Sequence, residues 1–144
     1  MGLDYFCPDC RERFVVVFET TIMTTRPEES EFMLLLRQPN QGPHPTPEEM
    51  GRIMQRFTTW MEGMSARGIV IGTGGLEVNG KILRGPRGIS LTDGPYPETK
   101  EIVGGYVIVK AASLDDAVEI ARDCPGLDYR MAVEVRQVKH RRQP

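Results

Sequence analysis

Two nearly continuous apolar runs, each followed by the pattern of a capped amphipathic helix, set the fold that this chain can adopt. The runs are FMLLLR, residues 32–37, and GGYVIVKA, residues 104–111. A short run with few polar residues is typical of a strand that is covered on both faces. Each run therefore predicts a central strand of a sheet, followed by a helix that crosses one face of that sheet.

The first helix is predicted to begin at Pro47 and to end near Gly68. Thr46, Pro47 and Glu49 supply an N-cap, a first-turn proline and the acid of a capping box. Apolar residues then recur at steps of three and four, as one face of a helix requires. These residues are Met50, Ile53, Met54, Phe57, Trp60, Met61 and Met64. The stripe is favoured as ordinary core packing, and a ligand cavity lined by thioethers is the alternative.

The remaining segments complete a repeated pattern. Residues 69–83 predict a strand and a hairpin, with Asn79 and Gly80 forming a tight two-residue turn, and GISLT (88–92) is a further short strand. Ser113 caps a second helix, and the alternating residues 131–138 predict the last strand. The order is βαβ, a hairpin, then βαβ. This order indicates an α+β fold, a ferredoxin-like split βαβ sandwich with an extra hairpin.

The chain divides into three parts. Residues 1–30 are interpreted as a loosely ordered N-terminal extension, because residues 24–31, TTRPEESE, are polar and contain a proline, as linkers do. Within the extension, FVVVF (14–18) is either an added edge strand or exposed apolar surface. Residues 31–138 form the compact domain, and residues 139–144 form a basic tail. A length of 144 residues suits one such domain.

Composition argues against several classes of protein. The formal net charge of -2 provides no overall field for nucleic acid, and no apolar run approaches the roughly 20 residues that span a bilayer. A cytoplasmic protein is expected, with no direct binding to nucleic acid or membrane. Cys7 and Cys10 have the spacing of a zinc knuckle, but a closed site needs four ligands and the sequence offers no second pair. No metal and no cofactor are assigned.

The two predicted helices cover only one face of the predicted sheet, so the second face is left open. Both apolar runs place apolar side chains on each face of the sheet. Burial of apolar surface is favourable by roughly 25 cal/mol per Å², so the second face needs a cover. A second copy of the same sheet is the economical cover, which predicts a homodimer through the sheet face.

The segment DGPYPETKE, residues 93–101, concentrates charge and proline just before the second apolar run. Asp93 would ordinarily accept a hydrogen bond from the amide two residues on, but that residue is Pro95 and has no N–H. Its carboxylate is left with the Tyr96 amide, with Lys100 or with a ligand. Gly104 and Gly105 leave room for a ligand or a backbone to approach closely. The alternative is a solvated turn followed by a β-bulge.

The chain resembles the YCII-related proteins, specifically the DGPF subgroup. The likeness is carried by FMLLLR, ARGIVIGTGGL, LTDGPYPETKEIVGGYVIV, SLDDAVEIA and VEVRQV, between residues 32 and 138. It implies a dimeric α+β barrel, an enzymatic role that involves a histidine and an aspartate, and association of some members with extracytoplasmic-function sigma factors. The family histidine of the first helix aligns near Phe57, and residues 47–66 contain no histidine.

Two functions from different classes follow. The first is a small-molecule-binding domain, possibly an enzyme, with its cleft between the first helix, the sheet and residues 93–101. In that hypothesis Asp93 or Glu98 is the general base, and the ligand is bound by the residues Tyr96, Lys100, Gly104, Gly105 and Trp60. The second is a noncatalytic regulatory module that acts on a sigma factor or another transcription-related partner.

Overall fold

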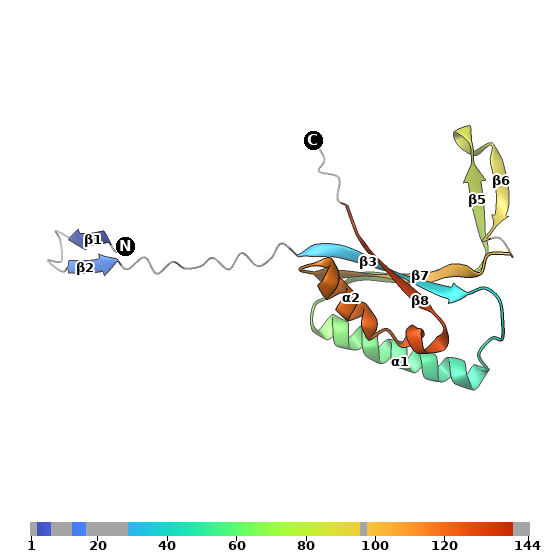
Figure 1. Cartoon of the computed structure of the whole chain (residues 1–144), viewed down its shortest axis with the longest axis horizontal. Coiled ribbons are helices and arrows are strands. Elements are labelled where there is room, and N and C mark those ends of the chain that lie inside the picture. The colour runs from blue at the N-terminus through green and yellow to red at the C-terminus, as the bar shows by residue number, and fades with distance from the viewer. Residues whose placement is uncertain (1–2, 7–12, 17–28, 96–97, 140–144) are drawn as a thin grey trace.

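The computed structural model describes residues 3–6, 13–16, 29–95 and 98–139. Its main body is a four-stranded sheet with both helices on one face (Figure 1). The strands are β3 (Ser30–Pro39), β4 (Val70–Gly75), β7 (Glu101–Ala111) and β8 (Ala132–Gln137), in the order β4-β7-β3-β8. Every neighbouring pair is antiparallel. The arrangement confirms the predicted α+β, ferredoxin-like fold.

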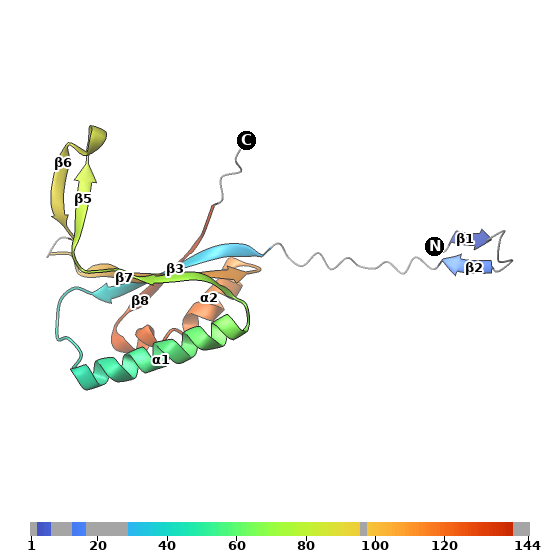
Figure 2. The same ribbon diagram turned by 180° about the vertical axis from the view of Figure 1, so that it is seen from behind.

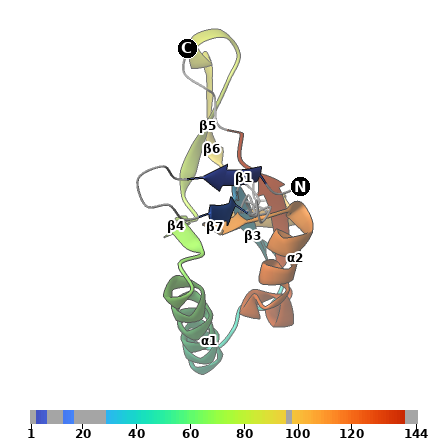
Figure 3. The same cartoon turned by 90° about the vertical axis from the view of Figure 1, so that its left-hand side faces the viewer.

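The helices are α1 (Pro47–Ala66) and α2 (Leu114–Arg122), which lie side by side beneath the sheet (Figure 3). The predicted caps are present: the Thr46 hydroxyl accepts a hydrogen bond from the Glu49 amide, and the Thr46 amide donates to the Glu49 carboxylate. Ser113 accepts in the same way from the Asp116 amide. Each cap satisfies amide groups that the first helical turn leaves unpaired.

The core lies between the sheet and the helices. Phe32 and Leu34 of β3 and Val107 and Val109 of β7 are almost wholly buried there. They pack with helical residues such as Ala117 of α2. Because side chains alternate along a strand, these four residues share the face that the helices cover.

The opposite face of the sheet, here called the open face, is not covered by either helix (Figure 2). Alternation places Met33, Leu35 and Arg37 of β3 and Tyr106 and Ile108 of β7 on this face. These residues are half-buried in the single chain. Apolar side chains therefore occupy both faces of the central strands.

The hairpin consists of β5 (Gly80–Arg84) and β6 (Ser90–Gly94), and it stands up from the end of the sheet on the side away from the helices (Figures 1 and 2). The predicted turn at Asn79 and Gly80 is wrong, because Gly80 is a strand residue paired with Gly94. The chain reverses at residues 85–89, where Gly85, Arg87 and Gly88 have the positive φ angles that a tight reversal needs.

The N-terminal segment contains β1 (Leu3–Phe6) and β2 (Arg13–Val16), which form a separate two-stranded sheet. The first residues of FVVVF therefore belong to this small sheet and do not extend the four-stranded one. Cys7, Cys10, most of the predicted linker and the end of the basic tail lie outside the described residues. Neither described helix combines the length and apolarity that crossing a bilayer requires.

Candidate functional site

A cavity of about 720 Å³ lies between the N-terminal half of α1, the loop of residues 40–45 and one end of the sheet. The sheet contributes the end of β3, the end of β4 and the start of β7. Another side is closed by residues 129–131, which are the last residue of the short 3₁₀ helix η2 (Pro125–Tyr129) and the two residues after it. The volume falls within the usual range for small-molecule sites.

The apolar stripe of α1 divides between core and cavity. Trp60, Met61 and Met64, in the C-terminal half, pack against the buried core, as the favoured interpretation predicted. The N-terminal half lines the cavity instead, through the residues Met50, Ile53, Met54 and Phe57. Met50 is 43% exposed and Met54 is 55% exposed, so these side chains are not filling a core.

The start of β7 is shaped by a β-bulge. Leu36 of β3 pairs with Gly105 and Arg37 pairs with Val103, which leaves Gly104 as an extra residue on β7. Gly104 and Gly105 both line the cavity. A Cβ atom at Gly104 would lie 2.7 Å from the Gln38 side chain, and one at Gly105 would lie 2.9 Å from the Gly74 carbonyl oxygen. The two glycines therefore allow close packing at the cavity wall.

Few ionisable groups border the cavity. Glu49 is one, but its carboxylate accepts a hydrogen bond from the Thr46 amide at 2.8 Å. That amide, together with the Thr46 hydroxyl, lowers the pKa of Glu49 from its ordinary value. The others are His44 on the loop, the Tyr129 phenol and Arg130, whose backbone has a positive φ of 65°. Within residues 29–95 and 98–139, no cluster of three His, Cys, Asp or Glu side chains is arranged to bind a metal.

The model of the YCII-related domain matches residues 31–141, well over half of the chain. The chain belongs to the YCII-related family. A search of curated proteins finds no match. The YCII-related match spans every element that borders the cavity. Phe57 of α1 lies on the cavity wall.

In this YCII-related domain, the described residues of the 93–101 loop do not border the cavity. Asp93 lies in β6, its side chain is 87% exposed, and its carboxylate contacts the Lys81 ammonium directly across the hairpin. Lys81 is a partner that the sequence analysis did not consider. Glu98 and Lys100 are exposed and do not border the cavity, and Tyr96 lies outside the described residues. The general-base role of Asp93 or Glu98 stays a prediction.

Trp60 lies away from the cavity, at a shallower hollow of about 560 Å³ between α1 and η2. Its ring contacts Phe57 edge to face, with 6.0 Å between the centroids. Next to it, the Arg56 guanidinium lies 2.6 Å from the Asp128 carboxylate, which raises the pKa of Arg56, as does its hydrogen bond to Tyr129. Of the seven predicted site residues, Gly104 and Gly105 are the two that the described structure places at the cavity.

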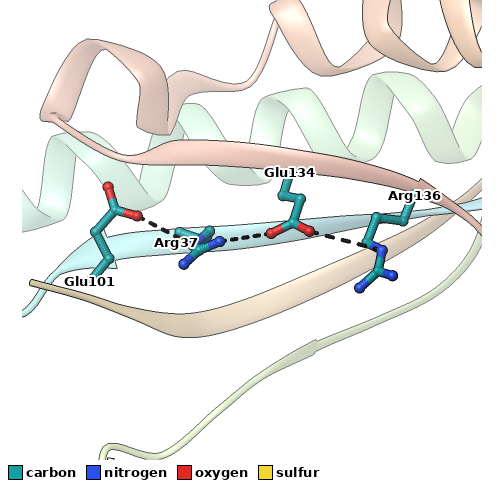
Figure 4. A network of polar contacts seen from close by, with 4 residues as sticks. All are labelled: Arg37, Glu101, Glu134 and Arg136. Carbon is teal, nitrogen blue, oxygen red and sulfur yellow. Dashed lines mark hydrogen bonds and ion pairs between the residues drawn. The ribbon is translucent and has the colours of Figure 1, made fainter. Parts of the chain in front are cut away.

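The open face of the YCII-related domain carries a row of alternating charges (Figure 4). Arg37 of β3 lies 3.3 Å from Glu101 of β7 and 2.8 Å from Glu134 of β8, and Glu134 lies 3.9 Å from Arg136. The row crosses three strands and is partly exposed. It balances charge on a face whose other side chains are largely apolar.

Sequence reasoning missed the cavity residues His44 and Arg130. The sequence around His44 did indicate a shaped loop, because QGPHP combines a glycine with two prolines, which stiffen a loop. Arg130 gave no signal, since nothing in a linear sequence shows that the end of η2 returns to the residue 40–45 loop.

Proposed function

We propose that this YCII-related domain is a small-molecule-binding protein whose site is the cavity between α1, the residue 40–45 loop and the sheet. The observation that carries the proposal is the division of the α1 stripe. Met50 and Met54 are exposed to the cavity although their helix carries the spacing of core residues. A concave, mostly apolar site with few polar groups is the usual form of a ligand pocket.

Methionine suits this role physically. Its unbranched thioether adapts to irregular shapes and makes favourable contacts with aromatic rings. Met50, Met54 and Met131 border the cavity together with the Phe57 ring. We therefore expect a ligand with a flat or branched apolar body, which removes these side chains from water when it binds.

Methyl NMR tests the proposal directly. Protein labelled at the methionine methyl groups is screened against small carboxylates, phosphonates, amines and aromatic alcohols. Ligands are expected to shift the Met50, Met54 and Met131 signals while the signal of Met33, on the open face, stays in place. Met54→Glu is expected to abolish the shifts. The matched control is Leu91→Glu, an exposed apolar residue of the hairpin. Hits that shift only Met33, or that bind Met54→Glu unchanged, would contradict the proposal.

We also propose that the protein works as a homodimer through the open face. Met33, Leu35, Tyr106 and Ile108 form a half-buried apolar surface there. The charged row beside them alternates in sign, so a second copy is able to meet each charge with its opposite.

A regulatory module remains the second candidate function, and the β5–β6 hairpin favours it. Leu83, Ile89 and Leu91 are largely exposed on this hairpin, with Ile89 at its tip 85% exposed. Exposed aliphatic residues on a projecting element are typical of a protein contact. A pull-down against extracytoplasmic-function sigma factors, with Ile89→Asp as the matched variant, tests this candidate. Capture that Ile89→Asp does not reduce would argue against it.

A further inference from the structure

We infer that the cavity ligand is an apolar molecule that carries a carboxylate, and that Arg130 binds this carboxylate. The inference rests on the proposed cavity function, because it names the class of ligand for the same site. It is drawn from the charges that face the cavity, from the way the Arg130 guanidinium is held, and from the apolar walls around it.

The acidic side chain that borders the cavity already has a hydrogen-bond partner, whereas the basic side chains leave positive charge available for a ligand. Glu49 is the acidic residue at this wall, and its carboxylate is engaged by the Thr46 amide of the capping box. Arg130 and His44 are the basic residues at the cavity. Among the described residues, no carboxylate lies within ion-pair distance of Arg130. The site therefore presents an uncommitted cation to whatever occupies it.

The nearest acidic residue along the chain is already paired. Asp128 lies two residues before Arg130, but its carboxylate is 2.6 Å from the Arg56 guanidinium, on the side of the shallower hollow. The Arg56 guanidinium also donates a hydrogen bond to the Tyr129 hydroxyl oxygen, 3.3 Å away. These contacts tie the end of η2 to α1, and the described part of the chain provides no counter-ion for the guanidinium of Arg130.

The position of the Arg130 guanidinium is fixed by two unusual backbone conformations. Arg130 ends η2 in the left-handed region, with its amide donating to the Gly126 carbonyl oxygen. Gly42, with a φ of 108°, is the loop residue opposite. A Cβ atom at Gly42 would lie 3.0 Å from one terminal guanidinium nitrogen and 3.3 Å from the other. The guanidinium thus packs against the bare Gly42 backbone, which pre-organises its donors at the cavity.

This arrangement selects a carboxylate more strongly than a neutral polar group. A guanidinium offers a planar fork of donors that matches the two oxygens of a carboxylate. The rest of the lining, which includes Leu36, Ile53, Phe57 and Ile102, is apolar and suits a hydrocarbon body. A phosphate is also an anion, so phosphonates provide the comparison that separates these two classes of ligand.

The test uses the full chain and four probes with one ring system: 2-naphthoate, 2-naphthalenemethanol, 2-naphthylmethylamine and 2-naphthylphosphonate. Binding is measured by calorimetry and by the methionine methyl shifts. We expect naphthoate to bind about tenfold or more tightly than the alcohol, as a charge-assisted hydrogen bond provides, and the amine to bind most weakly. Naphthylphosphonate is expected to bind more weakly than naphthoate.

Arg130→Asn removes the guanidinium while keeping a residue that tolerates the left-handed conformation. It is expected to lower naphthoate affinity about tenfold and to leave the affinity of the alcohol unchanged. Arg67→Gln, which removes the same charge at the exposed end of α1, is the matched control. If the alcohol binds in the cavity as tightly as naphthoate, or if Arg130→Asn weakens both equally, the inference is overturned while the cavity proposal stands. If no probe shifts the cavity methyl groups, the cavity proposal itself is contradicted.

Discussion

Gly105 of β7 lies so close to Gly74 of β4 that a methyl group at position 105 would lie 2.9 Å from the Gly74 carbonyl oxygen. The obstacle is backbone within a paired strand, so it is unable to move aside as a flexible side chain does. The cavity wall at this point consists of two strands in direct backbone contact.

Gly105→Ala is therefore expected to lower the free energy of unfolding by about 1–3 kcal/mol, the usual range for an overpacked site. Urea denaturation followed by circular dichroism measures the change. Gly72→Ala in β4 is the matched control, because its added Cβ meets no atom within 4 Å. Equal stability of the two variants would contradict the close contact.

The capping box at the start of α1 predicts a pH dependence. The Thr46 amide and hydroxyl lower the pKa of Glu49 from its ordinary value of 4.5. The folded form is therefore stabilised by the carboxylate above the unfolded pKa, and this contribution is lost as the pH falls through the folded value. Carboxyl NMR titration is expected to place the Glu49 pKa below the ordinary value of a glutamate. Thr46→Ala should raise the Glu49 pKa toward its ordinary value, and an unchanged titration would argue against the cap.

The open-face homodimer makes Leu35 a sensitive position. Leu35→Asp places a charge in the middle of the half-buried apolar surface, next to Glu134 of β8, so it is expected to convert the dimer to a monomer. Sedimentation velocity at micromolar concentration measures the mass. Leu91→Asp on the hairpin is the control for a new exposed charge. A wild-type chain that sediments as a monomer would contradict the homodimer proposal.

Asp93→Asn distinguishes the cavity from the residue 93–101 loop. Because the Asp93 side chain contacts Lys81 and is largely exposed, the variant is expected to change ligand affinity by less than about twofold, within the scatter for surface substitutions. Thermal-shift titration with the hits of the methyl screen gives the comparison. A tenfold loss with an intact fold would return the loop to the binding site.

Cys124 is expected to be chemically protected. It is 2% exposed, and burial raises the pKa of its thiol, so little thiolate is available to react at neutral pH. Mass-spectrometric mapping after iodoacetamide treatment should find Cys124 unmodified in buffer and fully alkylated in urea. Rapid alkylation of native Cys124 would show that the end of α2 opens readily.

The fold was accessible from sequence because each of its main elements carries a local signal. FMLLLR reads as a buried strand, and the run of Thr46, Pro47 and Glu49 reads as the start of a helix, whatever lies around them. The hairpin was placed wrongly because Asn79 and Gly80 favour a turn by propensity alone. The actual reversal lies at residues 85–89, and the strands it joins pair Lys81 with Asp93 across the hairpin.

The candidate site could be predicted from the sequence only in part, because some of its contacts form only in the folded chain. Gly104 and Gly105 stand out in an apolar run, so their special role was visible. The use of Met54 as cavity wall and of Met64 as core was not, since both have the same helical spacing. The two methionines differ in how far the sheet extends above their turns of α1, and no local sequence pattern indicates that distance.

The bulge at Gly104 decides which chemistry reaches each side of the molecule. Side chains alternate along a regular strand, so a β7 in which Gly104 took an ordinary pairing position, without the bulge, would turn over the residues that precede it. Ile102 would leave the hollow for the outer surface, and the carboxylate of Glu101 would swing inward, away from Arg37. One residue outside the ladder thus keeps Ile102 at the cavity and Glu101 beside Arg37, and regular pairing of that residue would put an anion into the compartment that we expect to receive one from a ligand.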